Sequence, residues 1–334
     1  MSSKSLETRD LATQEYGFYD RLRAEFPSQI IVDATEICNL ACIHCPHPSF
    51  KASEHYEARL LGPDLNAKMV AEVQQHGKGI TQYIRYTSEG EPLTNRYIFE
   101  MLNYASCYSG VTVTLTTNGT LMDEKRIEKL LASGVNVIDI SVDAHTPETY
   151  AKIRVNGNLN ITRPNVLKLI QMAAQVENPP KIVVSYVEQP LNFHETQEFE
   201  QFWRDNGANY VVMRRLHSSA GALQQTADTL RQQAEPTARY PCLYPWERIT
   251  LTPGGELAFC PQDWVHGSVV ADYRTTTIHE TWQSQFYQNL REAHLCNNFA
   301  QHQFCGQCPD WQGTRWPGVG RSYADMIEEF KDRE

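Results

Sequence analysis

The chain has 334 residues, of which 41% are hydrophobic and 21% are charged, and this composition is typical of a globular protein with a full-sized core. Thirty basic and forty acidic residues give a net charge of −10, which argues against nucleic acid as a partner, because nucleic-acid binding depends on basic patches. No apolar run approaches the roughly 20 residues that span a bilayer, and the first residues lack the apolar segment of a secretory signal. We therefore expect a cytoplasmic protein with no membrane partner.

Short apolar runs alternate with longer amphipathic ones between residues 30 and 217. The expected strands are 30–33, 83–87, 111–116, 137–142, 181–187 and 210–214, and the expected helices are 63–75, 95–108, 123–132, 164–176 and 195–206. This alternation predicts an α/β fold with a parallel sheet, and six βα units make a partial, TIM-like (β/α)6 barrel.

The remaining segments differ from the barrel in composition. Residues 1–29 are expected to form a helical extension, and the polar, Gln-rich stretch 218–239 is expected to be a linker that carries a short helix. Residues 240–318 are rich in Trp, Pro, Gly and Cys and form a predicted second module. Residues 319–334 are expected to form a terminal helix and a charged tail.

Nine cysteines without a secretion signal predict metal or redox roles in a reducing compartment rather than disulfides. Cys38, Cys42 and Cys45 lie on one short stretch, with three residues between the first pair and two between the second. Three thiolates on one loop can hold three irons of a [4Fe–4S] cube and leave the fourth iron open. A zinc loop and buried structural thiols are the alternatives. Cys107 stands apart, and we expect it to be a buried structural thiol.

The spacing of these three cysteines resembles the signature of the radical S-adenosylmethionine (radical SAM) enzymes. The resemblance implies that the open iron chelates the methionine end of S-adenosylmethionine, and that His44 packs beside the cluster or the adenine. The stretch from Glu89 to Pro92, Glu-Gly-Glu-Pro, resembles the Gly-Gly-Glu-Pro motif of the same family. By this resemblance Glu91 binds the amino group of the cofactor and Gly90 gives clearance. Glu89 departs from the motif because it replaces the first glycine with an acid. The sequence leaves open whether its side chain touches the cofactor or points away from it.

The ends of the third and fourth expected strands also resemble stretches of this family. The resemblance implies that Asn118, Ser141 and Asp143 lie near the ribose or the methionine, and that Arg154 lies near the cofactor carboxylate. An ordinary turn at Asn118 and a surface ion pair at Arg154 are the alternatives. Dinucleotide-binding loops of the GxGxxG type are absent from the sequence.

Four cysteines of the second module make a predicted closed tetrathiolate site. Pro253, Gly254 and Gly255 predict a hairpin turn between two short strands, which brings the flanking thiols to one end of the hairpin. A Cys-x-x-Cys knuckle then completes the set, for which zinc is the alternative occupant. The order resembles the SPASM/twitch extension of radical SAM enzymes, which implies one auxiliary [4Fe–4S] cluster. The predicted ligands are Cys242, Cys260, Cys305 and Cys308.

The resemblance to this family implies an external one-electron donor such as flavodoxin or ferredoxin, and a 5′-deoxyadenosyl radical that takes a hydrogen atom from a C–H bond. We expect a dehydrogenase that oxidises a secondary alcohol of a sugar or aminocyclitol to a ketone, with the auxiliary cluster as electron acceptor. His217 and Glu188 are the candidate bases. Sugar epimerisation, with Cys296 or Cys107 as hydrogen donor, and peptide modification are the alternative reactions. The last alternative is that the protein is not an enzyme but an iron–sulfur carrier or scaffold.

Overall fold

The computed structural model describes residues 24–87, 89–233, 239 and 241–313. The segment 319–334 lies outside these residues, as does the segment 1–29 apart from residues 24–29. Within the described ranges, no helix is both long enough and apolar enough to cross a membrane.

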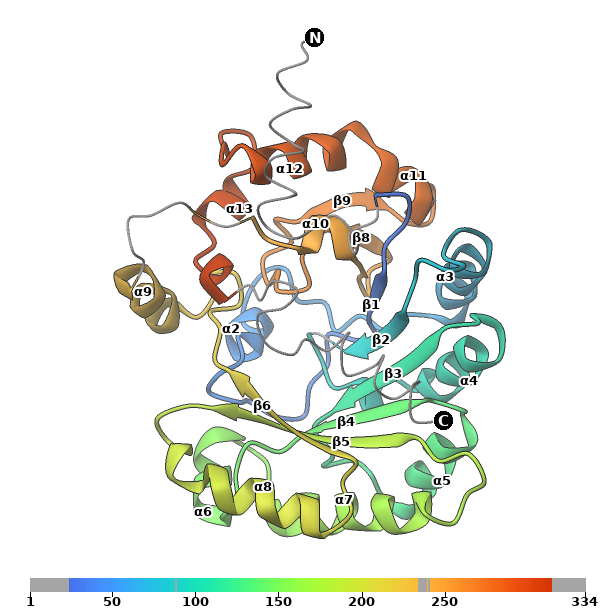
Figure 1. The fold of residues 1–334 in the computed structure, drawn as a ribbon, viewed down its shortest axis with the longest axis vertical. Coiled ribbons are helices and arrows are strands. Elements are labelled where there is room, and N and C mark those ends of the chain that lie inside the picture. Colours follow the sequence, from blue (N-terminus) through green and yellow to red (C-terminus); the bar gives the residue numbers. More distant parts are fainter. Residues whose placement is uncertain (1–23, 88, 234–238, 240, 314–334) are drawn as a thin grey trace.

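Six parallel strands form the first part of one sheet and confirm the six expected strands (Figure 1). Each strand pairs in parallel with the next one along the chain, and β1 and β4 are buried over almost their whole length. Burial on both faces is typical of parallel sheets that helices cover. The strands are β1 (Gln29–Asp33), β2 (Tyr83–Thr87), β3 (Thr112–Thr117), β4 (Val137–Ser141), β5 (Lys181–Glu188) and β6 (Tyr210–Arg215).

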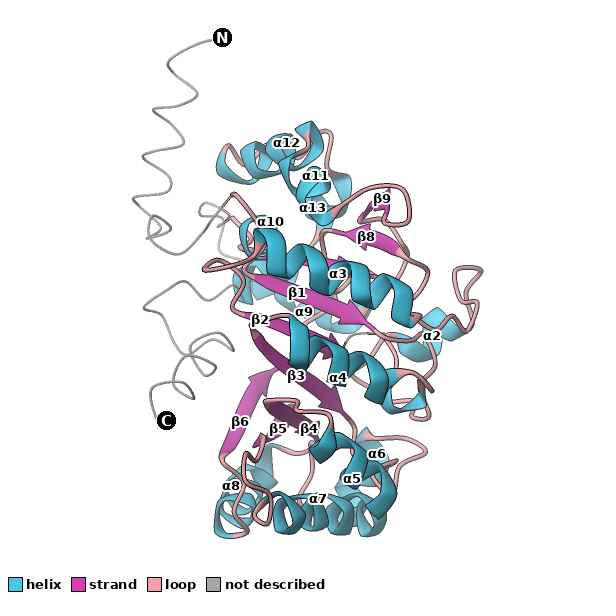
Figure 2. Cartoon of the chain, turned by 90° about the vertical axis from the view of Figure 1, so that its right-hand side faces the viewer, coloured by secondary structure: helices cyan, strands magenta, loops and turns pink. Residues whose placement is uncertain are grey.

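Five helices cover the outer face of these strands (Figures 1 and 2). Each helix buries at least one apolar side chain completely against the sheet: Met69, Met101, Leu130, Leu169 and Phe199 in chain order. The helices are α3 (Pro63–His76), α4 (Ile98–Tyr108), α5 (Glu124–Ala132), α7 (Leu159–Ala173) and α8 (Thr196–Asp205).

Two details of the helices differ from the expectation. Helix α7 begins at Leu159, earlier than predicted, because the Asn158 side chain caps it and Pro164 lies inside the helix rather than at its start. Helix α6 (Pro147–Ile153) was not predicted, and the Thr146 side chain caps its N-terminus. A further short helix, α2 (His47–Lys51), follows the cysteine loop.

The C-terminal module continues the barrel sheet rather than forming a sheet of its own. Strand β7 (Arg248–Leu251) pairs in parallel with β1, and the expected hairpin joins it to the antiparallel β8 (Glu256–Ala258). Gly255 in the turn has φ of 84°, a conformation that favours glycine. A last strand, β9 (Val269–Asp272), pairs with β8. The strand order is β6-β5-β4-β3-β2-β1-β7-β8-β9, so the barrel is partial, as expected.

The rest of the module is mainly helical. It comprises α10 (Tyr244–Glu247), β9 (Val269–Asp272), α11 (Ile278–Gln283), α12 (Gln285–Leu295) and α13 (Gln303–Gln307). The expected short helix of the linker is α9 (Gln224–Gln233). Three 3-10 helices complete the described elements: η1 (Pro92–Thr94), η2 (Phe193–Glu195) and η3 (Asp310–Gly313).

Candidate active site

The cysteine loop follows β1, at the end of the sheet where barrels of this kind carry their chemistry. Its backbone is fixed on the segment after α6, because Ala41 and Ile43 donate hydrogen bonds to the carbonyls of Val155 and Ile153, each at 3.0 Å. Among the three cysteines, Cys42 is buried and the other two are half-buried. Burial raises the pKa of Cys38 to about 11 and that of Cys45 to about 12. Such thiols become ligands only when a metal displaces their protons.

A buried ion pair supports the cysteine loop from the other side. The Arg154 guanidinium lies 2.5 Å from Oδ2 of Asp143 and donates a hydrogen bond to the Cys42 sulfur at 3.5 Å. Burial lowers the pKa of Arg154, but Asp143 and Cys42 outweigh that effect and raise the pKa above its usual value. A permanently charged donor on this sulfur suits a thiolate ligand. The alternative of a surface ion pair at Arg154 is therefore wrong, since both partners are buried, whereas its predicted place near the cofactor carboxylate stays a prediction.

His44 and Asp143 also contact each other. Nε2 of His44 lies 3.3 Å from Oδ2 of Asp143, and Nδ1 lies 3.4 Å from the side-chain amide of Gln189. Burial lowers the pKa of His44 to about 4, so the ring is neutral near pH 7. Asp143 itself has φ of 65° and accepts the Val187 N–H at 2.7 Å. The structure therefore brings three predicted site residues, His44, Asp143 and Arg154, together at the cysteine loop.

Glu91 joins the ends of β2 and β3. Its buried carboxylate accepts hydrogen bonds from the Leu93 N–H at 3.1 Å, the Thr117 hydroxyl at 2.6 Å and the Asn118 N–H at 2.7 Å. The carboxylate is thus oriented by the protein, and its predicted contact with the amino group of S-adenosylmethionine stays a prediction. The absence of a side chain at Gly90 lets the backbone of Thr35 pack against it, because a Cβ there would lie 2.2 Å from the Thr35 carbonyl oxygen.

Asn118 ties the end of β3 to the cysteine loop. Its Nδ2 donates to Oδ1 of Asn39 at 3.0 Å, and its Oδ1 accepts the Thr120 hydroxyl at 2.6 Å. Asn39 lies directly after Cys38, so this contact positions the loop. Ser141 ends β4 opposite Ser185 of β5 and is half-buried. The predicted contacts of Asn118 and Ser141 with the cofactor stay predictions.

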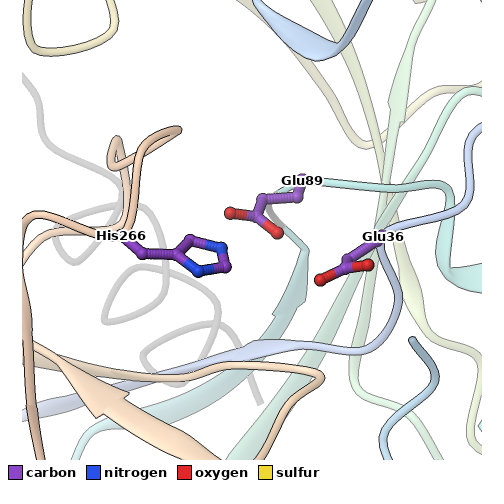
Figure 3. Close-up of side chains that lie close together, drawn as sticks. All are labelled: Glu36, Glu89 and His266. Carbon is purple, nitrogen blue, oxygen red and sulfur yellow. The ribbon is translucent and has the colours of Figure 1, made fainter. Parts of the chain in front are cut away.

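Glu89 lies close to Glu36 of the barrel and to His266 of the C-terminal module (Figure 3). It is buried, and its N–H donates to Oδ1 of Asp33 at 3.2 Å. Burial raises the pKa of Glu89 to about 8 and that of Asp33 well above its usual value. Sequence reasoning missed the other acids and the histidine here, since they lie on loops far apart in the chain.

The four predicted auxiliary ligands are gathered in the C-terminal module. Burial raises the pKa of Cys260, and the other three thiols of the set raise it further, which shows that all four are near neighbours. Burial likewise raises the pKa of Cys242 to about 12 and that of Cys308 to about 11. Arg239, which sequence reasoning missed, faces the same thiols and donates to the Gly306 carbonyl at 2.9 Å.

The predicted catalytic residues lie apart from one another. His217 is exposed after β6, near enough to His44 for its charge to lower the pKa of that ring. Glu188 lies on the helix-facing side of β5 with Tyr186 and accepts the Thr196 hydroxyl at 3.1 Å, so it does not face the cysteine loop. Cys296 is exposed at the end of α12, and Cys107 is exposed on α4, so the expected burial of Cys107 is wrong.

Comparison with protein families decides what this arrangement is. The model described as the radical SAM superfamily matches residues 32–202, just over half of the chain. The chain belongs to the radical SAM superfamily. A second model, described as an iron–sulfur cluster-binding domain and named SPASM, matches residues 242–309. The radical SAM and SPASM regions bind [4Fe–4S] clusters and S-adenosylmethionine. That the two groups of thiols described above are the cluster ligands stays a prediction.

Curated relatives resemble parts of this radical SAM chain. The "AdoMet-dependent heme synthase" of Methanosarcina barkeri is 36% identical over 128 residues, which is 38% of this chain and 34% of that protein. The "GTP 3′,8-cyclase" of Desulforamulus reducens is 30% identical over 177 residues, 52% of this chain and 51% of that protein. The chain thus spans about a third to a half of the length of these relatives.

Two solved structures show the same fold over most of the chain. BtrN in complex with AdoMet and 2-DOIA has a TM-score of 0.57 at 17% identity and covers 84% of this chain and 92% of its own. Streptococcus suis SuiB bound to the precursor peptide SuiA has a TM-score of 0.63 at 13% identity and covers 97% of this chain and 77% of its own. At these identities the likeness is one of fold.

Proposed function

We propose that the chain is a radical SAM dehydrogenase that oxidises a secondary alcohol of a sugar or aminocyclitol to a ketone, with the auxiliary cluster as electron acceptor. The closed group of four thiols, Cys242, Cys260, Cys305 and Cys308, is the observation that supports it. A cluster with a thiolate on every iron has no open position for substrate, which suits it to electron transfer.

The bound cofactors supply a radical that removes a hydrogen atom from a C–H bond. The carbinol carbon then carries an unpaired electron. Loss of the hydroxyl proton to water and of that electron would form the C=O bond. A cluster held by Cys242, Cys260, Cys305 and Cys308 would accept the electron. The substrate loses two hydrogens in all, one as an atom and one as a proton and an electron.

The residues around His217 favour a substrate-holding role over that of a base. Nδ1 of His217 accepts the Ser219 N–H at 3.2 Å, so the neutral ring carries its proton on Nε2. A donor at Nε2 can hold the alcohol oxygen, whereas a base needs a free nitrogen lone pair. Glu188 is poorly placed to act as a base, because its carboxylate faces α8, where it accepts the Thr196 hydroxyl.

Epimerisation is less well supported than dehydrogenation. A thiol that returns a hydrogen atom to the substrate must lie inside the site. Of the nine cysteines, all of them described, the two outside the cluster ligand sets are Cys107 and Cys296, and both are exposed. Peptide modification is the second candidate, because the fold of SuiB with its bound precursor peptide matches 97% of this chain.

The test is anaerobic turnover of the iron-loaded protein with S-adenosylmethionine, a strong reductant and candidate sugars and aminocyclitols, together with 2-DOIA, which the BtrN structure contains. Mass spectrometry should show a product that has lost two hydrogens, formed together with 5′-deoxyadenosine. A product of unchanged mass would indicate epimerisation instead. Turnover of peptides but of no sugar or aminocyclitol would contradict the proposal.

Two sets of cysteine variants separate the roles of the clusters. Wild type should hold about eight irons and Cys38→Ala/Cys42→Ala/Cys45→Ala about four, since each cube holds four. Cys305→Ala/Cys308→Ala should still form 5′-deoxyadenosine but should lose the ketone product. Cys107→Ala is the matched control, because this exposed thiol belongs to neither cluster. Ketone formation by the Cys305/Cys308 variant would overturn the electron-transfer role.

A further inference from the structure

Three side chains from different loops converge between the barrel and the C-terminal module (Figure 3). Glu36 follows β1, Glu89 follows β2, and His266 lies on the loop between β8 and β9. One ligand atom from each lies within 4.8 Å of the other two. None of the three belongs to either group of cluster thiols, and the activity proposed above does not use them.

Four carboxyl groups lie close together here. Asp33, Glu36, Glu89 and Asp263 are all buried. Of these, Glu36 is paired with Arg59, whose Nε lies 2.5 Å from Oε1 of Glu36. Buried carboxylates are costly unless a proton or a cation balances them.

One of these carboxylates is incompletely satisfied. Glu89 is only 7% exposed, and its Oε2 is buried without a hydrogen-bond partner in the part of the chain that the structure describes. Figure 3 shows that this carboxylate points into the space between Glu36 and His266. An adjoining cavity of about 10 Å³, lined by Asp33, Glu89, Cys260 and His266 among others, has room for a single water.

We propose that Glu36, Glu89 and His266 bind one divalent first-row metal ion, such as Mn²⁺ or Zn²⁺. Carboxylate and imidazole ligands together suit such ions. Three ligand atoms spread evenly around a metal at about 2.2 Å are about 3.8 Å apart. Atoms that lie within 4.8 Å of one another therefore need to close by about 1 Å at most. The adjoining cavity supplies the position of a water ligand.

The position of this metal gives it a structural consequence. Glu36 and Glu89 belong to the loops that carry Cys38 and Gly90, and His266 lies six residues after Cys260. A shared ion therefore clamps the loop of the auxiliary cluster to the S-adenosylmethionine end of the barrel.

The test is a titration of the iron-loaded protein with Mn²⁺ under anaerobic conditions, with both clusters oxidised. The EPR signal of free Mn²⁺ measures how much is bound, and thiolate sites disfavour this ion. Wild type should bind one Mn²⁺ per chain, and Glu89→Gln and His266→Asn should each weaken binding by more than about tenfold, since even outer partners of a metal site cost that much. If Glu89→Gln also loses iron, its loss of Mn²⁺ binding is not informative. His266→Asn then provides the test, because His266 is half-exposed and its replacement disturbs the fold less.

Two control variants remove the same chemical groups nearby. Glu57→Gln removes an exposed carboxylate that lies 3.9 Å from Arg59, and His55→Asn removes the imidazole that lies 5.3 Å from the His266 ring. Both should bind Mn²⁺ as wild type does. The proposal is overturned if wild type leaves Mn²⁺ free, if Glu89→Gln and His266→Asn bind it normally, or if the controls lose it equally.

Discussion

The Asp310 carboxylate binds Ser218 through both the backbone and the side chain of that residue, with the N–H at 2.7 Å and the hydroxyl at 2.8 Å. It also accepts the Ala220 N–H at 2.7 Å. Asp310 lies two residues after Cys308, whereas Ser218 directly follows His217 at the end of the barrel. The knuckle of the auxiliary cluster therefore holds the barrel loop that carries a residue of the proposed substrate site.

Replacing this carboxylate should destabilise the protein. Asp310→Ala leaves the N–H groups of Ser218 and Ala220 without their acceptor, and a buried donor without a partner costs about 1–3 kcal/mol. We expect the free energy of unfolding to fall by about that amount, measured by urea denaturation of the iron-loaded protein. Asp205→Ala is the control, because the exposed Asp205 carboxylate accepts a hydrogen bond from the exposed Gln201 side chain at 2.7 Å. Equal urea midpoints for Asp310→Ala and wild type would refute the coupling.

A second prediction concerns the buried pair of Arg154 and Asp143. Arg154→Met removes the guanidinium and leaves the buried Asp143 carboxylate beside the His44 ring and the Val187 N–H, neither of which replaces the lost positive charge near pH 7. Removing one partner of a buried ion pair lowers the free energy of unfolding by about 3–5 kcal/mol. We expect a fall of that size in the free energy of unfolding, and a lower iron content at the first cluster because Cys42 loses its charged donor.

The matched control for this pair is Arg126→Met. Arg126 lies 2.6 Å from Asp123, but both side chains are substantially exposed. An exposed ion pair contributes about 0–1 kcal/mol. If Arg126→Met and Arg154→Met lowered the stability equally, burial of the Arg154 pair would not be the cause.

A third prediction tests the tight approach at Gly90. In Gly90→Ala the new Cβ would lie 2.2 Å from the Thr35 carbonyl and 2.6 Å from the Ile37 carbonyl, both of which are backbone atoms. Overpacking of this kind costs about 1–3 kcal/mol or more, and it displaces the chain just before Cys38. Gly62→Ala serves as the control, because a Cβ there meets nothing within 4 Å. Iron content and urea midpoint should fall for Gly90→Ala alone.

Much of the barrel could be predicted from local patterns. The six strands follow from apolar runs, and Cys38, Cys42 and Cys45 are close in the sequence, so their grouping needed no knowledge of the fold. The side chain of Glu89 shows what local patterns cannot predict. Its carboxylate lies close to His266, which is 177 residues away in the chain, and no local pattern contains that contact.

The same limit explains other differences between expectation and structure. The pairing of β7 with β1 joins residues more than 200 positions apart, so the sequence pattern predicted a hairpin but not a shared sheet. Glu188 was chosen for its place at a strand end, but strand alternation directs it toward Thr196. Cys107 lies on the exposed side of a helix whose other face is buried, and a single residue type does not reveal which side it takes.

The last prediction concerns Trp264, which packs the loop after Cys260 against the segment that follows the first cysteine loop. Its ring lies 5.7 Å from the Phe50 ring and 6.4 Å from the His47 ring, and it is only 8% exposed. Trp264→Ala should lower the free energy of unfolding by about 3–5 kcal/mol, as truncation of a buried aromatic residue does. Phe193→Ala, at a side chain that is 68% exposed, should change it by no more than about 0.5 kcal/mol. Because Trp264 bridges two segments rather than filling one element, its loss should also make the loop of residues 260–268 exchange its amide hydrogens faster. Unchanged hydrogen exchange in that loop would show that the contact with Phe50 and His47 does not hold it.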